Sequence, residues 1–136
     1  MPGANTIQNV PFKSSGAAIR ALRFVAQVGD ETCKEADTLG MACCGVAQAA
    51  IANPNANGQN EITQPKAIAV MQNGNSWVVA GAALATRGVQ ITTDNQGRAV
   101  AAATTNIVLG TLLSTAGAAG DLVLVALDVT GGSIKA

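Results

Sequence analysis

The sequence has no histidine and no tyrosine, and its aromatic side chains are limited to Phe12, Phe24 and Trp77. Histidine is the commonest general base and the base of Ser–His and Cys–His catalytic arrangements. It is also a major zinc ligand, and the three thiols of this chain do not complete a tetrahedral site. We therefore expect a protein that is not an enzyme and that holds neither a metal nor a cofactor.

Charged side chains are also scarce, at 12% of residues, and the eight basic residues balance the eight acidic ones. Typical soluble domains carry about 25% charged residues. The basic residues are scattered singly, so the electrostatic footprint of direct nucleic-acid binding is missing. A neutral surface with little charge repulsion is suited to contacts between protein subunits.

Long apolar runs are absent as well. The uncharged stretch 99–120 is interrupted by Thr104, Asn106, Gly110 and Ser114, whereas a transmembrane helix needs about 20 predominantly apolar residues. The N-terminus has no basic segment followed by an apolar one, so no secretory signal is visible. These patterns predict that the protein is made in the cytoplasm and does not associate with a membrane.

The cysteines are Cys33, Cys43 and Cys44, an odd number with two neighbours in sequence. Adjacent cysteines seldom form a disulfide with each other, because the bond requires a particular separation and direction of the Cβ atoms. Reduced, partly buried thiols are the favoured interpretation. A disulfide between Cys33 and one of the pair is the alternative.

The length of 136 residues suits one hydrophobic core. Residues 1–16, rich in Pro, Gly, Asn and Gln, are predicted to form an extended N-terminal arm, and residues 17–136 a single β-rich domain. Two states stay open for such an arm: disorder in the isolated protein, as is common for termini, or contact along a neighbouring subunit in an assembly. In the second case Ile7, Val10 and Phe12 would be its anchors.

After this arm come short alternating segments separated by turns. Residues 21–28 alternate well enough for a strand with one wet face, and residues 41–51 fit a buried strand or a short helix. The Asn-rich segment 53–60 is the strongest loop signal. Further strands are expected at 62–72, 76–80, 89–91, 98–101, 107–113 and 121–129.

Two turn signals connect these later segments. Asn73-Gly74 is typical of a type I′ hairpin turn, and Asp94-Asn95-Gln96-Gly97 is a second turn-rich sequence. About seven short strands at spacings near ten residues predict a mainly β fold, a small antiparallel barrel or sandwich.

Trp77, close to the first of these turns, is more often a core residue in such a position, and an interface anchor is the alternative. The arginines, among them Arg20 and Arg87, are either surface charges or partners for carboxylates of a neighbouring molecule. The candidate interface residues are Ile7, Val10, Phe12, Arg20, Trp77 and Arg87.

The C-terminal half, AGAALATRGVQITTDNQGRAV (80–100) followed by IVLGTLLSTAGAAGDLVLVAL (107–127), resembles the capsid cement, or decoration, proteins of tailed bacteriophages. The similarity consists of an Ala/Gly-rich lead, a D-x-x-G-R-A turn, a strand with an internal glycine, the sequence A-A-G-D and a final Val/Leu-rich strand. The corresponding positions are Asp94, Gly97, Arg98, Ala99, Gly110, Ala118, Ala119, Gly120 and Asp121. The front half agrees more loosely, through ALRFVAQVGD and GVAQAAI.

The resemblance implies a β-barrel-like subunit on the outer surface of the virion. Its partners would be the major capsid protein and further copies of itself, commonly as a homotrimer, and it would stabilise the head shell against the pressure of packaged DNA. Two other functions stay open. One is another phage structural component, from the neck, the tail or the base of a head fibre. The other is a glycan- or ligand-binding β module in which Trp77 would stack on the ligand.

Overall fold

The computed structural model describes residues 8–14, 19–30, 32–48, 53–54, 60–61, 67–129 and 133–135. Within these ranges the regular structure is entirely β-strand, so the predicted mainly β fold class is confirmed. The main sheet consists of β1 (Gln8–Ser14), β2 (Phe24–Gln27), β3 (Thr32–Glu35), β4 (Gly45–Ala47), β7 (Ala67–Val79), β8 (Gln90–Thr93), β9 (Ala99–Ala101), β11 (Gly110–Leu112) and β12 (Leu122–Asp128). Two separate two-stranded ladders join β5 (Asn53–Pro54) to β6 (Asn60–Glu61) and β10 (Ile107–Val108) to β13 (Ser133–Ile134).

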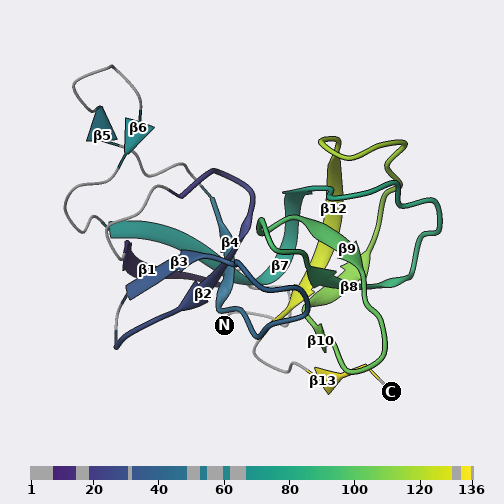
Figure 1. The fold of residues 1–136 in the computed structure, drawn as a ribbon, viewed down its shortest axis with the longest axis horizontal. Helices are drawn as coiled ribbons and strands as arrows, with labels where there is room; N and C mark the ends of the chain where they lie inside the picture. The colour runs from purple at the N-terminus through teal and green to yellow at the C-terminus, as the bar shows by residue number, and fades with distance from the viewer. Residues whose placement is uncertain are drawn as a thin grey trace, which may run out of the picture.

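The nine-stranded sheet curls back on itself on both sides of β7. On one side, β1 pairs with both β3 and β7, so that β1, β3, β2, β4 and β7 form a closed circuit of pairings. On the other side, the sheet continues through β12, β11, β8 and β9, and a bridge between Ala80 and Ala99 returns it to the end of β7. Figure 1 shows the two halves, with β1 to β4 on the left and β8, β9 and β12 on the right.

The hairpin turn predicted at Asn73-Gly74 is wrong, because β7 runs through both residues from Ala67 to Val79. Gly74 has φ 113°, which glycine adopts at little cost. β1 pairs with β7 up to Asn73, and β12 pairs with it from Asn73 onward. Asn73-Gly74 therefore marks the point where β7 changes its pairing partner from β1 to β12. Hydrogen bonds to the neighbouring strands override the local preference of these two residues for a turn.

Two clusters of buried side chains form the core. The larger cluster spans both halves, since it includes Phe24 of β2 and Val123 of β12, and the smaller cluster lies within the first half. Successive residues of β2 enter different clusters: Phe24 packs with the larger one and Val25 with the smaller one. Because side chains alternate along a strand, both faces of β2 are covered. The wet face expected for residues 21–28 is therefore wrong over Phe24–Ala26, all three of which are buried.

Most of the other predicted elements are confirmed. The turn at Asp94–Gly97 connects the β8–β9 hairpin, residues 107–113 contain β10 and β11, and residues 121–129 contain β12. Residues 41–51 contain the buried strand β4. Among the described residues, no helix has the length and apolar character to span a bilayer.

The division into residues 1–16 and 17–136 stays a prediction. Residues 8–14 form β1, which pairs with β7 and β3 of its own chain. Of the predicted loop 53–60, Asn53–Pro54 and Asn60 lie in the short ladder of β5 and β6, and residues 55–59 lie outside the described residues.

Candidate interaction surface

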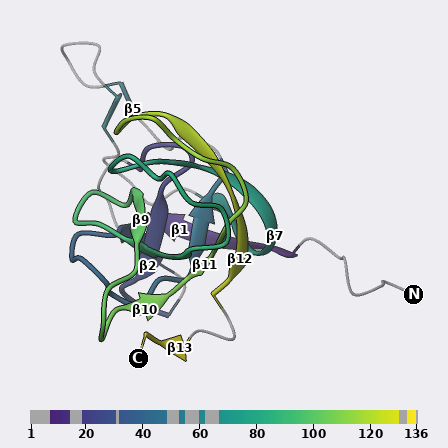
Figure 2. The ribbon, with the colours of Figure 1, turned by 90° about the vertical axis from the view of Figure 1, so that its right-hand side faces the viewer.

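The outward side of β7, β12 and β11 carries a cluster of apolar side chains. Trp77 of β7 lies opposite Leu124 of β12, and Val79 lies opposite Leu122. Leu113, directly after β11, donates its backbone N–H to the carbonyl oxygen of Leu124 at 2.8 Å. We call Trp77, Val79, Leu113, Leu122 and Leu124 the outer apolar face. Figure 2 shows β7 and β12 side by side along one flank of the molecule.

Three side chains of this face are exposed to solvent, and Val79 and Leu124 are partly buried. Trp77 and Leu122 are each 49% exposed and Leu113 is 39% exposed. The interpretation of Trp77 as a core residue is therefore wrong. Its neighbours Ser76 and Val78 point inward and are buried, so the register of β7 places the indole outside.

The outer apolar face rests on a fixed backbone. The inward residues of β12, Val123 and Val125, are fully buried in the larger cluster. The N–H of Leu124 donates to Ser114 Oγ at 2.8 Å. Because its supporting strand is paired on both sides and packed underneath, the face is held in one arrangement.

The D-x-x-G-R-A sequence forms a closed turn between β8 and β9. Asp94 Oδ1 accepts the backbone N–H groups of Gln96 and Arg98, each at 2.8 Å. Asp94 Oδ2 accepts the Nε–H of Arg98 at 2.8 Å. One carboxylate thus satisfies the turn backbone and pairs with the arginine.

The same turn joins the two halves of the sheet. The N–H of Phe24 in β2 donates to the carbonyl oxygen of Gly97 at 2.7 Å, and Arg23 Nη1 donates to that of Gln96 at 3.0 Å. Gly97 has φ 73°, and a Cβ there would lie 2.8 Å from the carbonyl oxygen of Phe24. Only glycine fits this contact without strain.

The A-A-G-D sequence forms the turn that leads into β12. Asp121 Oδ2 accepts the N–H groups of Gly117 at 3.1 Å and Ala118 at 3.2 Å. The N–H of Ala80 donates to the carbonyl oxygen of Asp121, which ties this turn to the end of β7. Asp94 and Asp121 therefore both act as backbone acceptors in turns.

Gly110, the internal glycine of the strand pattern, allows close approach between strands. A Cβ at this position would lie 2.5 Å from the carbonyl oxygen of Ala126 and 2.8 Å from Val125 Cγ1. The family-like positions that the sequence singled out are thus turn and packing residues, with no catalytic arrangement among them.

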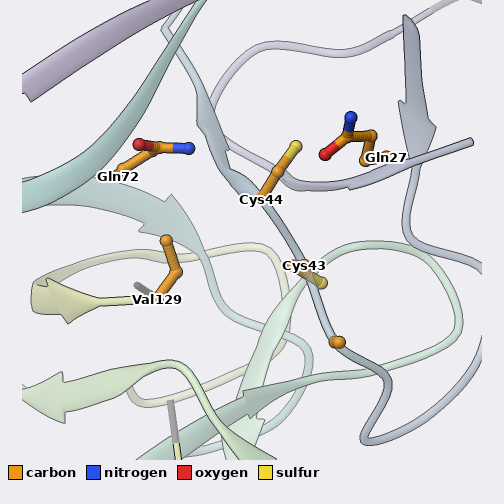
Figure 3. Close-up of a pocket in the computed structure, with 6 residues that line it drawn as sticks. Gln27, Cys43, Cys44, Gln72 and Val129 are labelled. Atoms are coloured by element: carbon orange, nitrogen blue, oxygen red, sulfur yellow. The ribbon is translucent and has the colours of Figure 1, made fainter. Parts of the chain in front are cut away.

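An open pocket of about 320 Å³ lies between β2, the segment before β4, β7 and the end of β12. It is lined by Gln27, Ala42, Cys43, Cys44, Gln72 and Val129. In Figure 3 the side-chain amides of Gln27 and Gln72 stand on either side of Cys44.

The three thiols are free, and burial raises the pKa of each. All three cysteines are unpaired, as the reduced interpretation predicted. Burial raises the pKa of the Cys44 thiol to about 12 and that of the Cys33 thiol to about 11. Burial, followed by the neighbouring Cys44, also raises the pKa of the Cys43 thiol. Thiols held protonated are poor nucleophiles and poor metal ligands, and the described residues contain no cluster suited to a metal ion.

The other candidate interface residues are not among the five that define the outer apolar face. Arg20 is exposed and forms an ion pair with Glu35, with Nη2 and Oε1 2.9 Å apart. This hydrogen-bonded partner raises the pKa of the Arg20 guanidinium. Arg87 is exposed in the loop between β7 and β8. Val10 and Phe12 lie in β1, and Ile7 lies outside the described residues.

The sequence interpretation found Trp77 and missed the rest of its face. Residues 121–129, DLVLVALDV, are apolar at nearly every position, which is typical of a strand covered on both sides. In the structure only Val123, Val125 and Leu127 are buried, and Leu122 and Leu124 remain partly or largely open. The available signal was the second apolar side of this strand, formed by Leu122 and Leu124. Had it been assigned to the molecular surface, it would have indicated the outer apolar face.

Over the described residues the fold is that of a small, mainly β protein. The fold is similar to that of the head fibre gp8.5 N base of bacteriophage phi29, with a TM-score of 0.66 and 18% sequence identity, over 91% of this chain and 96% of that one. No match was found among curated proteins. Residues 2–128 match the phage family described as structural cement protein (E217 gp24/Pam3 gp6), and the chain belongs to this family. It is a phage structural protein.

Proposed function

We propose that the protein is a cement subunit that binds the outer surface of the assembled phage head and stabilises it against the pressure of the packaged DNA. The observation that carries this proposal is membership of the cement family over residues 2–128, nearly the whole chain. The partner would be the major capsid protein, and the place of action the outside of the virion. Self-association as a homotrimer is part of the same proposal.

The physical mechanism is the addition of contact area across junctions between coat subunits. Burial of apolar surface contributes roughly 25 cal/mol per Å², so a contact of a few hundred Å² contributes several kcal/mol before association costs. A shell offers many copies of the same junction. Modest affinity at each site is therefore enough when the sites are repeated and neighbouring cement subunits also touch.

The test is binding to purified shells that lack the protein. We expect the protein to sediment with expanded shells and not with isolated coat subunits, because assembly completes the site. We also expect decorated, DNA-filled heads to release DNA at a higher temperature than undecorated heads. Failure of the wild-type protein to sediment with shells would refute the proposal.

A second candidate is the base of a head fibre. The likeness to the phi29 head fibre gp8.5 N base favours it, since that likeness covers nearly the whole of both chains. Electron microscopy of virions carrying a labelled copy separates the two. A label spread over the shell supports the cement function, and a label seen only where fibres attach supports the fibre base.

A further inference from the structure

We propose that the outer apolar face is the surface by which the protein sits on the head shell, and that it contacts an uncharged, apolar surface of the coat. The inference rests on the proposed cement function and adds the identity of the contact surface. It assigns binding roles to Val79, Leu113, Leu122 and Leu124 together with Trp77.

The chemistry of the face selects an uncharged partner. Between Asp121 and Asp128 the outward positions of β12 are Leu122, Leu124 and Ala126. The opposite positions of β7 are Val79, Trp77 and Asn75. A charged group brought against these side chains would lose its water without gaining an ion-pair partner. An apolar, neutral coat surface carries no such penalty.

The area of the face distinguishes the coat from a second copy of this chain. With a half-exposed indole and two open leucines, the apolar area open to solvent is on the order of 300 Å². Two such faces packed together would bury roughly 600 Å² in total, about half of the smallest specific, stable interfaces. The face is therefore too small to hold a free dimer by itself. On a shell the same small contact would be repeated and supplemented by contacts between neighbouring cement subunits.

The support beneath the face favours binding without rearrangement. β12 is paired with β7 on one side and with β11 on the other, and its inward side chains are fixed in the core. Little backbone freedom remains to be lost on binding, so more of the gain from apolar burial appears as affinity. Trp77 has the size of the anchors that dominate protein interfaces.

The test compares single substitutions in shell binding, with each variant's unfolding midpoint checked by circular dichroism. We expect Trp77→Ala and Leu122→Ala each to weaken binding about tenfold or more. Leu39→Ala is the matched control, because Leu39 is also exposed, at 58%, and lies in the loop between β3 and β4. It is expected to bind as the wild type does. Leu122→Lys, which places a charge in the face at an exposed position, is expected to abolish binding.

The outcomes separate this inference from the proposed function. If the wild type binds and the Trp77 and Leu122 variants bind equally well, the face is not the contact and the cement function stands. If no form binds, the cement function itself fails. Sedimentation of the free protein tests whether a second copy of this chain covers the face. If the free protein is an oligomer that Trp77→Ala dissociates, the assignment of the face to the coat is overturned.

Discussion

At the scale of single residues, the positions that resemble the cement family are explained by backbone contacts. Asp94 and Asp121 accept backbone N–H groups in two turns. Gly97 and Gly110 are places where a Cβ would collide with a carbonyl oxygen of another strand. Such residues specify how strands approach each other, so they identify a fold and not a reaction.

Gly97→Ala is expected to destabilise the protein by about 3 kcal/mol, from the left-handed backbone conformation and the collision with Phe24 together. Gly88→Ala is the matched control. Gly88 has φ 88°, but nothing lies within 4 Å of a Cβ there, so only the conformational cost of about 1–2 kcal/mol is expected. Urea unfolding measures both. Equal losses for the two variants would mean that the contact with β2 has no role.

The raised pKa of the buried thiols predicts a loss of stability in alkali. The pKa of Cys33 is about 11 in the fold, above the value of about 8.5 for an exposed thiol. Between these values the unfolded chain releases a proton that the fold retains, so the free energy of unfolding falls as pH rises. Below about pH 8.5 this contribution is fully present.

We expect the wild type to lose stability between pH 8 and pH 10, and Cys33→Ala to lose less over the same interval. In this variant the pH dependence of the unfolding free energy is reduced and not abolished. The pKa values of Cys43 and Cys44 are also raised by burial, so both thiols still lower the stability as pH rises. Urea unfolding at both pH values is the measurement. An identical pH dependence in the variant would contradict the assignment to Cys33.

At the scale of elements, β7 connects both halves of the sheet. Its first part pairs with β1 and β4, and its second part with β12. The Gly97 contact with β2 adds a further connection between the halves. The larger core cluster also contains side chains of both halves. We therefore expect the two halves to unfold as one unit.

Val25→Ala tests this coupling, because Val25 is fully buried in the smaller cluster and Trp77 lies on the other half. We expect a loss of about 2 kcal/mol, seen equally by Trp77 fluorescence and by far-UV circular dichroism. Val28→Ala, at an exposed position just after β2, is the control and should leave stability nearly unchanged. A shift seen only by circular dichroism would show that the halves unfold separately.

The sequence predicted those elements whose signals are local. The β8–β9 turn and the strand β12 follow from short-range turn and apolar patterns. The continuous strand through Asn73-Gly74 did not follow, because the residues paired with Asn73 in the neighbouring strands, Gln8 and Asp128, are distant in sequence. The outward position of Trp77 depends on the register of β7 against β12, which no local pattern specifies.

At the scale of the whole molecule, the eight basic and eight acidic residues cancel, so no overall charge draws the protein toward a partner. The net charge is zero, and the outer apolar face is built from uncharged side chains. If the protein binds the shell through this face, as proposed above, the attraction comes from removal of apolar surface from water. Salt screens interactions between exposed charges and leaves apolar burial largely intact.

Shell binding is therefore expected to change by less than about threefold between 50 and 500 mM NaCl. It should strengthen in ammonium sulfate, since sulfate is excluded from protein surfaces and favours burial. Titration of undecorated shells with labelled protein at several salt concentrations measures both effects. A steep loss of affinity with rising NaCl would instead indicate that charged side chains such as Arg20 and Arg87 make the contact, and the Trp77 and Leu122 variants would then bind as tightly as the wild type.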